Sequence, residues 1–403
     1  MKRTSHLRWY ILALIFLATV ICYMDRQVIS ILMPVISDKD HYNLSKSTQA
    51  WIFNAYLFAY TIGPSIMGWL MDKWGSRRGY AVSMGFWSAA GVLTALALVI
   101  GTGITRVLPI ALAPIVVGMM VCRFVLGIGE SANWPAAIKA ISEWFPARER
   151  SLAVGWFNSG SSVGAAIAPG LCTYILLRYG WQWTFVTVGS IGFVWIIGWL
   201  LYYRPLKNHP HVSEEERAYI QADQAATTKA KRVRWAELLR VPQVRGVVLT
   251  RFFMDQIWWF YSTWLPTFLA TDRGLDVKKG WIPLTVAFLA SDLGNLYGGW
   301  ASSRLIRRGY SMNAARKMVM TPCAAVMMIG LAVPFIPQVW HTQGTMWQWI
   351  GSIPPNAMVI ALVSLVTFSY QSWSVNMLTI PADVLPAEIV GSAAGLSHMG
   401  AGL

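Results

Sequence analysis

Ten apolar stretches, each long enough to cross a lipid bilayer, leave this chain little choice of fold. A spanning helix needs about 20 apolar residues, and lipid offers no partner to unpaired backbone groups, so such stretches must be helical. Only 13% of the 403 residues are charged, against about 25% in a soluble domain. We therefore predict an all-α integral membrane protein. The expected spans are residues 7–36, 48–71, 79–100, 107–135, 150–176, 181–203, 243–270, 281–303, 316–337 and 356–381, followed by a further helix that opens near residue 388.

The basic residues lie between the apolar stretches, and their distribution predicts the orientation. With the N-terminus in the cytoplasm, 22 of the 33 Lys and Arg residues fall in cytoplasmic loops, as the positive-inside rule requires. The net charge of +15 does not form a stripe with interleaved aromatics, so we expect no nucleic-acid partner. The four cysteines stand alone in apolar segments, so neither a metal site nor a disulfide framework is predicted.

One polar, charge-rich segment divides the chain into two parts. We predict an N-terminal six-helix bundle over residues 1–203, a cytoplasmic linker over 204–242 and a C-terminal bundle over 243–403. Short motifs repeat 240 residues apart, since Phe145-Pro146-Ala147 recurs as Leu385-Pro386-Ala387, which indicates an internal duplication. By that repeat the C-terminal bundle lacks its twelfth helix and part of its eleventh, and we expect the chain to be a fragment.

Four of the charged residues inside apolar spans form the main candidate site, because one charge there costs roughly 2.5–3.5 kcal/mol. They are Asp25, Arg26, Arg123 and Glu130, and the last two lie seven residues apart, on one helix face. An arginine fork matches a carboxylate, and protonation of a neighbouring acid frees the arginine for an incoming anion. This set predicts proton-coupled uptake of an organic anion. The alternative is a purely structural use, with Asp25 paired to Arg123 and Arg26 paired to Glu130.

The segment that links the second and third spans carries a family motif. Gly68-Trp69-Leu70-Met71-Asp72-Lys73-Trp74-Gly75-Ser76-Arg77-Arg78 resembles the G-x-L-x-D-R-x-G-R-R signature of the major facilitator superfamily. The resemblance implies the major facilitator fold of two six-helix bundles. It also implies a conformational latch, in which Asp72 pairs with the cytoplasmic end of a neighbouring helix while Arg77 and Arg78 hold the inner face.

Two further motifs resemble those of the anion:cation symporters within that superfamily. They are Tyr23-Met24-Asp25-Arg26 and the run from Arg123 to Ser131, and the run Glu143-Trp144-Phe145-Pro146-Ala147-Arg148 is similar to that of bacterial hexuronate transporters. The resemblance implies proton coupling by Asp25 and Glu130 and anion recognition by Arg26 and Arg123. Some hexuronate transporters lack the first of these acids, whereas galactonate-type relatives have it, so the substrate stays open between them.

Several polar residues inside spans are further candidates for substrate binding, although single polar residues join helices about as often. Tyr56 and Tyr60 lie one turn apart, and His398 is the repeat counterpart of Asn158. The roles of Asp292 and of the Arg251–Asp255 pair are left open. The candidate hydroxyl partners are Tyr56, Tyr60, Asn158, Ser162, Ser374, Asn376 and His398.

These features together predict a secondary transporter of the bacterial inner membrane. We expect a monomer that imports a hexuronate, such as glucuronate or galacturonate, with protons by alternating access. The proton gradient replaces any cofactor, because no Walker motif is present. Alternatives are symport of galactonate, glucarate, tartrate or phthalate, and a non-transporting membrane sensor. No enzyme is expected, because no Ser/His/Asp order or metalloprotease motif occurs.

Overall fold

The described part of the chain is built from helices, and no strand occurs in it. The computed structural model describes residues 6–38, 40–206, 209–221, 235–271, 273, 281–336 and 354–402. Seven helical segments among these residues are long and apolar enough to cross a membrane. The predicted all-α, multi-pass fold is confirmed.

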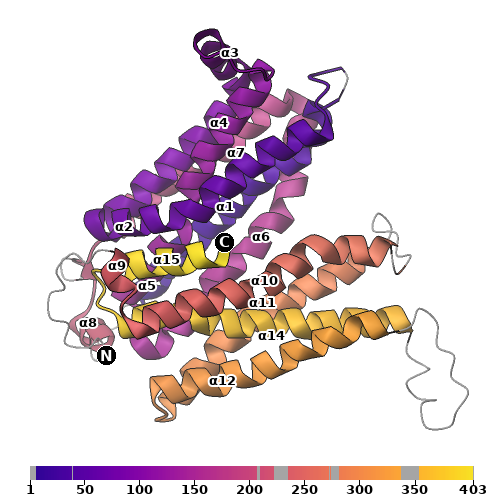
Figure 1. The fold of residues 1–403 in the computed structure, drawn as a ribbon. Coiled ribbons are helices and arrows are strands. Elements are labelled where there is room, and N and C mark those ends of the chain that lie inside the picture. The colour runs from indigo at the N-terminus through magenta and orange to yellow at the C-terminus, as the bar shows by residue number, and fades with distance from the viewer. Residues whose placement is uncertain are drawn as a thin grey trace, which may run out of the picture. The chain divides into compact units, whose positions relative to one another are not determined.

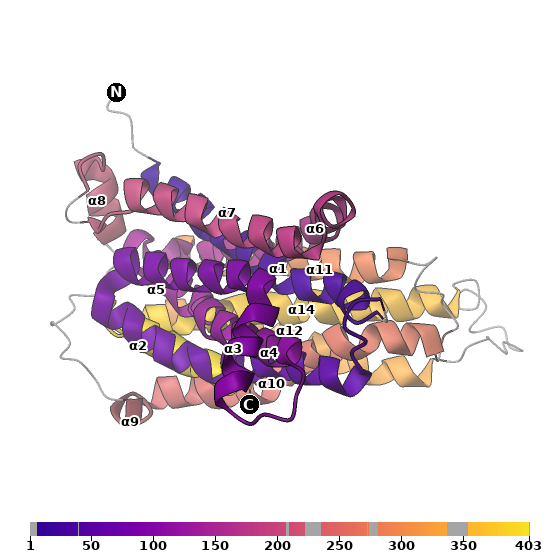
Figure 2. The same cartoon turned by 90° about the horizontal axis from the view of Figure 1, so that it is seen from above.

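The chain forms two compact units. Unit 1 comprises Met1–Ala147, Phe157–Phe252 and Ile380–Leu403, and unit 2 comprises Arg148–Trp156 and Phe253–Thr379. In unit 1 the long helices α1, α2, α4 and α7 pack side by side (Figures 1 and 2). The helices that lie wholly in unit 1 are α1 Leu7–Ile36, α2 Lys46–Leu93, the 3₁₀ turn η1 Thr94–Leu96, α3 Ala97–Val107, α4 Pro114–Glu130, α5 Asn133–Trp144, α7 Trp181–Tyr202, α8 Glu214–Gln221, α9 Trp235–Leu238 and α15 Val390–Gly402.

Unit 2 is built from helices around a smaller core. Its buried cluster joins Ala287, Val333 and Val363. In Figures 1 and 2 the long helices α10, α11, α12 and α14 are coloured from salmon red through orange to yellow. Its elements are α11 Trp281–Arg307, α12 Met312–Met327 and the 3₁₀ helix η3 Met328–Phe335, with most of α10 Pro242–Thr271 and α14 Pro355–Val384, while α6 Ala147–Tyr179 belongs to both units.

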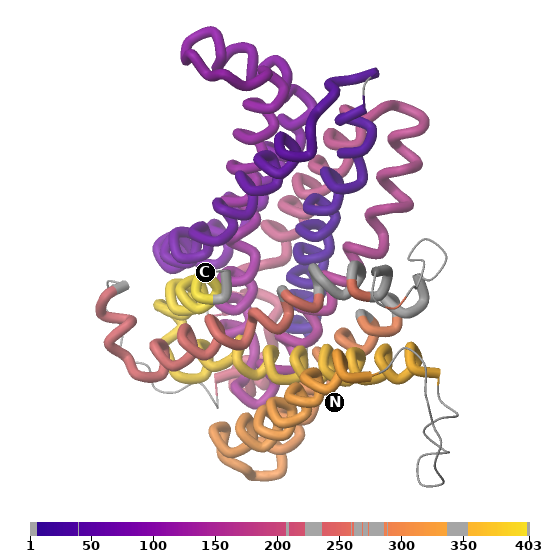
Figure 3. The backbone as a smooth tube through the Cα atoms, turned by 45° about the vertical axis from the view of Figure 1, so that its right-hand side comes forward, coloured from indigo at the N-terminus to yellow at the C-terminus, as the bar shows by residue number. Residues whose placement is uncertain are grey.

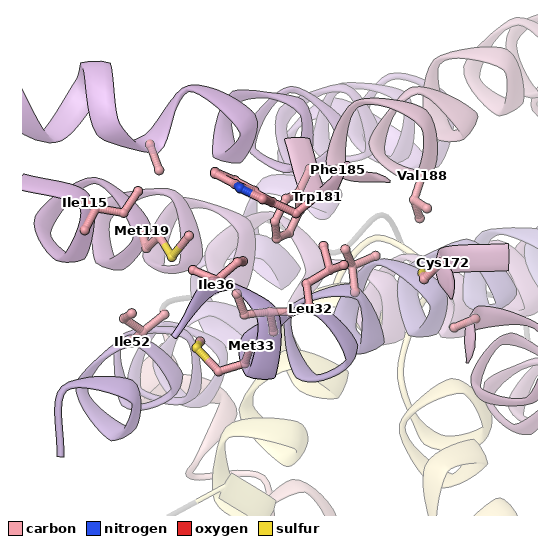
Figure 4. Packing of buried hydrophobic residues seen from close by; sticks show 14 of the residues in the cluster. Leu32, Met33, Ile36, Ile52, Ile115, Met119, Cys172, Trp181, Phe185 and Val188 are labelled. Carbon is pink, nitrogen blue, oxygen red and sulfur yellow. The ribbon is translucent and has the colours of Figure 1, made fainter. Parts of the chain in front are cut away.

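The core of unit 1 fills the space among its long helices. Leu32 and Ile36 of α1 are fully buried against Ile115 and Met119 of α4 and Phe185 of α7 (Figure 4). Aliphatic side chains on the inner stripes of neighbouring helices account for this packing. This packing fixes the positions of α1 and α4, the helices that carry Asp25, Arg26, Arg123 and Glu130.

The predicted spans differ from the helices most between residues 100 and 144, for local reasons. The span expected from residue 107 starts at Pro114, and the preceding helix ends at Val107, because Pro109 disfavours helix in the residue before it. The predicted break between the second and third spans is present as a turn inside α2, where Gly75 has φ of +73°. Residues 136–144, expected as loop, belong to α5, where Lys139 and Glu143 pair at i, i+4.

Helix α15 packs closely on α2 within unit 1, as Figures 1 and 3 show. Glycines make this approach possible, because a Cβ at Gly68 would clash with the carbonyl oxygen of Gly391. A Cβ at Gly395 would clash in the same way with the carbonyl oxygen of Pro64. Gly391 and Gly395, four apart on α15, and Gly68 on α2 thus let the two backbones touch, as small residues do at helix interfaces in membranes.

The predicted domain boundaries stay a prediction. The predicted domains are continuous stretches of sequence, whereas the two compact units group residues by their contacts and are each made of several stretches. Residues 380–403, expected in the C-terminal bundle, group with unit 1 through the contact of α15 with α2 and α5. Residues 207–208 and 222–234 of the predicted linker lie outside the described residues.

Candidate functional site

The guanidinium of Arg26 lies among three tyrosine rings. Its central carbon is 4.5 Å from the ring centre of Tyr60, 4.6 Å from that of Tyr23 and 5.5 Å from that of Tyr56. Tyr23 is one turn before Arg26 on α1, and the other two rings stack on each other on α2 at 5.6 Å. Cation–π attraction to several rings stabilises the arginine away from bulk water. The side chain of Arg26 keeps 23% of its surface exposed, while its Nε and Nη2 atoms are buried without a hydrogen-bond partner among the described residues.

Glu130 is the carboxylate next to this arginine. Its Oε2 atom lies 3.7 Å from an Arg26 nitrogen and accepts a hydrogen bond of 2.6 Å from the Tyr56 hydroxyl. Glu130 is fully buried at the end of α4, and its Oε1 atom has no hydrogen-bond partner among the described residues. A buried carboxylate oxygen without a donor is costly to keep charged, so this group suits a site that gains and loses a proton.

Asp25 and Arg123 lie deeper than Arg26 and are not paired with each other. Asp25 is 3% exposed, and its Oδ2 atom has no hydrogen-bond partner in the described chain. Arg123 is 2% exposed, donates to the Thr94 hydroxyl at 3.4 Å and lies 5.4 Å from the Phe185 ring centre. Of the two ion pairs in the structural alternative, only Arg26 with Glu130 comes within 4.0 Å.

An aromatic contact joins the arginine site to α15. The Nε2 atom of His398 is 3.5 Å from the Tyr60 hydroxyl, and its ring stacks on Trp134 of α5 at 5.3 Å. Trp134 in turn meets Phe157 of α6 edge to face at 5.2 Å. The Nδ1 atom of His398 is buried without a hydrogen-bond partner among the described residues. The structure thus brings together Arg26, Tyr56, Tyr60, Glu130 and His398 of the predicted site.

The other predicted hydroxyl partners are divided between the two units. Asn158 is buried on α6 in unit 1, and Ser162 is half-buried one turn further along. Ser374 and Asn376 are buried on α14 in unit 2. Asn376 accepts a hydrogen bond from Arg316 at 3.1 Å and donates to two backbone carbonyls, so its amide is already engaged by protein groups.

The polar candidates that the sequence left open have partners of their own. Asp255 accepts a hydrogen bond of 2.8 Å from the Tyr370 hydroxyl within unit 2. Asp292 is half-buried on α11.

Asp72 caps the start of α15. Its two carboxylate oxygens accept the backbone N–H groups of Gly391 at 3.1 Å and Ser392 at 2.7 Å. The first helical turn has free N–H groups and positive dipole charge, so a carboxylate there is stabilising. Lys139 completes the contact, since its Nζ atom lies 2.8 Å from Asp72 and donates to the Ala387 carbonyl at 2.6 Å.

The two arginines of the same motif differ in their surroundings. Arg77 donates to the backbone carbonyls of Leu200 at 2.6 Å and Tyr203 at 2.9 Å, and so caps the end of α7. Arg78 is exposed. Glu143 of α5 accepts from the hydroxyls of Ser76, at 2.9 Å, and Tyr203.

Sequence reasoning missed three residues of these two sites. Tyr23 could have been predicted, because a residue three positions before Arg26 lies on the same helix face. No sequence pattern marked Trp134 or Lys139 as a site residue. Trp134 contacts His398 of α15 and Lys139 contacts Ala387 just before that helix, and both partners lie more than 240 residues away in the sequence. No group of three His, Cys, Asp or Glu side chains suited to a metal ion occurs in the described chain.

The fold and the buried charges define a multi-pass helical membrane protein with a polar site among its helices. Residues 15–403 match the family model of the Major Facilitator Superfamily, and the chain belongs to that family. It is therefore a transporter and not an enzyme.

Two transporters are similar to this chain along most of its length. The hexuronate transporter of Escherichia coli K12 is 33% identical over all of this chain and 86% of its own length. The galacturonate transporter of Dickeya chrysanthemi is 34% identical over 82% of this chain and 91% of its own. Among solved structures, the proton:xylose symporter XylE shares the fold, with a TM-score of 0.70 and 16% identity over 99% of this chain and 87% of its own.

Proposed function

We propose that this protein imports a hexuronate, such as glucuronate or galacturonate, together with protons. The observation that carries the proposal is the guanidinium of Arg26, which is held on tyrosine rings with two buried nitrogens that lack a hydrogen-bond partner among the described residues. Its one carboxylate neighbour in an ion pair is Glu130, at 3.7 Å. The names of the two similar relatives support the same substrate class.

In the proposed cycle, Glu130 and the substrate carboxylate compete for Arg26. Protonation of Glu130 weakens its attraction to the arginine, and the fork then accepts the carboxylate of the sugar acid. Tyr60 and His398 offer a hydroxyl and a ring nitrogen to the hydroxyl groups of the sugar. Asp25, buried beside Arg26, is the second proton acceptor of the proposal.

The proposed energy source is the proton gradient, with no cofactor, and the proposed location is the bacterial inner membrane with a cytoplasmic N-terminus. Alternating access opens the site to each side of the membrane in turn, and the protein works as a monomer in this proposal. The Asp72–Lys139 contact with the start of α15 is the proposed latch of one of these states.

Uptake by purified protein in liposomes tests the proposal. Radiolabelled glucuronate or galacturonate should accumulate under an inward proton gradient and should fail to accumulate when an ionophore removes the gradient. Unlabelled galactonate, glucarate, tartrate and phthalate serve as competitors, and a competitor stronger than both uronates would move the substrate to that acid. Absence of uptake for every sugar acid would overturn the substrate class.

Two variants separate anion recognition from proton coupling. Arg26→Lys keeps the charge but loses the planar fork, so the thermal stabilisation by substrate should fall sharply. Glu130→Gln keeps a hydrogen-bond acceptor for Tyr56 but loses the titrating charge, so exchange of substrate should persist while gradient-driven uptake is lost. If Glu130→Gln still accumulates substrate against its concentration gradient, Glu130 is not the coupling residue.

A further inference from the structure

Two exposed tryptophans each carry a cation four residues further along the same helix. The Lys73 ammonium lies 4.9 Å from the ring centre of Trp69 on α2, and the Arg304 guanidinium lies 5.3 Å from that of Trp300 on α11. The first pair belongs to unit 1 and the second to unit 2. The i, i+4 spacing brings both side chains onto one face of the helix.

Both tryptophans lie near the end of a span predicted from the sequence, residues 48–71 for Trp69 and 281–303 for Trp300, and a turn follows each. Gly75, with φ of +73°, follows the first pair, and Gly309, with φ of +93°, follows the second. Trp69 is 40% exposed and Trp300 43%, so each indole faces the surroundings of the protein. An exposed indole at the end of a membrane span fits the level of the lipid head groups, where tryptophan is enriched.

The cations of both pairs lack an anionic partner in the described chain. Lys73 and Arg304 are exposed, and no described carboxylate lies within 4.0 Å of either. Further exposed arginines follow each pair, namely Arg78 after the first and Arg307 and Arg308 after the second. Each turn therefore presents clustered positive charge beside an apolar ring.

We propose that each pair is a binding site for an anionic phospholipid, with the head-group phosphate on the cation and the glycerol and upper acyl chain against the indole. Lys73 or Arg304 supplies the charge, and Trp69 or Trp300 holds that cation at the depth of the phosphate. The ring also provides an apolar surface that free inorganic phosphate would not use. Attraction of a basic residue to an anionic leaflet is enough to select charged over zwitterionic lipid.

The chain supplies a matched control. Arg178 lies 5.0 Å from the ring centre of Tyr174 at the end of α6, with the same i, i+4 spacing, and both side chains are exposed. No other basic residue lies within 25 positions of Arg178 in the sequence. It therefore has the aromatic–cation stack without the clustered charge.

Native mass spectrometry of the full chain with added phosphatidylglycerol or phosphatidylcholine tests the proposal. Wild type should retain up to two phosphatidylglycerol molecules in preference to phosphatidylcholine. Lys73→Gln and Arg304→Gln should each weaken one site about fivefold, the double variant should weaken both, and Arg178→Gln should have no effect. Trp69→Leu should weaken the first site while the charge remains.

Three results would overturn the proposal. They are equal retention of the two lipids by wild type, unchanged phosphatidylglycerol retention in the double variant, or complete displacement of the lipid by inorganic phosphate at equal concentration. The last result would mean that the site recognises a free anion and not a lipid. Melting temperatures of the variants in detergent check that each one is folded.

Discussion

The Tyr56 hydroxyl donates a hydrogen bond of 2.6 Å to the same Glu130 oxygen that lies 3.7 Å from Arg26. One carboxylate oxygen therefore accepts a hydrogen bond from a neutral hydroxyl and forms an ion pair with a guanidinium. The two contacts come from different helices, α2 and α1, and both converge on the end of α4. Any change in the charge of Glu130 must alter the contacts among all three helices.

Loss of the Tyr56 hydroxyl should destabilise the protein. A hydrogen bond to a buried charged group contributes about 1.5–3 kcal/mol, so Tyr56→Phe should lower the melting temperature in detergent. Tyr174→Phe is the matched control, because Tyr174 is 53% exposed and should be neutral. Equal melting temperatures for both variants would show that Glu130 is not charged in the folded protein at that pH.

A side chain at Gly68 should open the contact between α2 and α15. Since a Cβ there would clash with the Gly391 carbonyl, Gly68→Ala should cost about 1–3 kcal/mol through overpacking. Gly103→Ala is the control, because no atom lies within 4 Å of its added Cβ. The measurement is the melting temperature, together with the rate at which a cysteine at Ser65 reacts with a soluble thiol reagent. A rate unchanged by Gly68→Ala would contradict the close approach.

Removal of the buried ion pair between Arg8 and Glu216 should detach α8 from the start of α1. The two groups lie 2.9 Å apart with the Glu216 side chain 1% exposed, and breaking such a pair costs about 3 kcal/mol. Glu216→Gln should therefore lower the melting temperature and speed proteolysis after residue 203. Glu214→Gln is the control, because its pair with Arg217 is on the surface and contributes less than about 1 kcal/mol. Equal effects of the two variants would contradict a buried pair.

Stability should fall in mild acid through His209. Burial against Trp144 lowers the pKa of His209 below its usual range, so the unfolded chain, with a pKa of about 6.5, binds the proton more readily than the folded one. The stabilisation is thus fully present above about pH 6.5 and is lost as the pH falls through the lowered folded value. The melting temperature should drop between pH 7 and pH 5, and less so in His209→Gln.

Exposed His41 supplies the comparison for that experiment. His41→Gln should leave the pH dependence as in wild type. A slope that stays the same in His209→Gln, or that changes equally in both variants, would assign the acid sensitivity to another group.

The spans could be predicted from the sequence because hydropathy is a local property. The helix α7 at Trp181–Tyr202 lies within one residue of the predicted 181–203, and α1 matches residues 7–36. The errors fell where local chemistry outweighs hydropathy. Pro109 separates α3 from α4, which starts at Pro114 and not at residue 107, and residues 136–144, expected as loop, are helical with Lys139 and Glu143 paired.

The candidate site was predictable by residue type but not by contact. Arg26 and Glu130 were predicted as site residues because a charge inside an apolar span is costly and indicates a function. In the structure the Arg26 Nη2 atom lies 3.7 Å from the Glu130 Oε2 atom. Their partners were not all foreseen. Whether an arginine meets an acid, a ring or a hydroxyl depends on the rotation of each helix about its axis, which long-range packing sets.

The sequence by itself determined the class of this protein, its membrane-spanning helices and the residues whose burial needs an explanation. Only the tertiary structure decided that Arg26 lies partly exposed on Tyr23, Tyr56 and Tyr60 while Arg123 is buried over Phe185. It also decided that Asp72 caps α15, a helix more than 300 residues away along the chain. The physical reason is that the hydropathy of a segment depends on its own residues alone. Which side chains contact each other depends on which faces of different helices pack together.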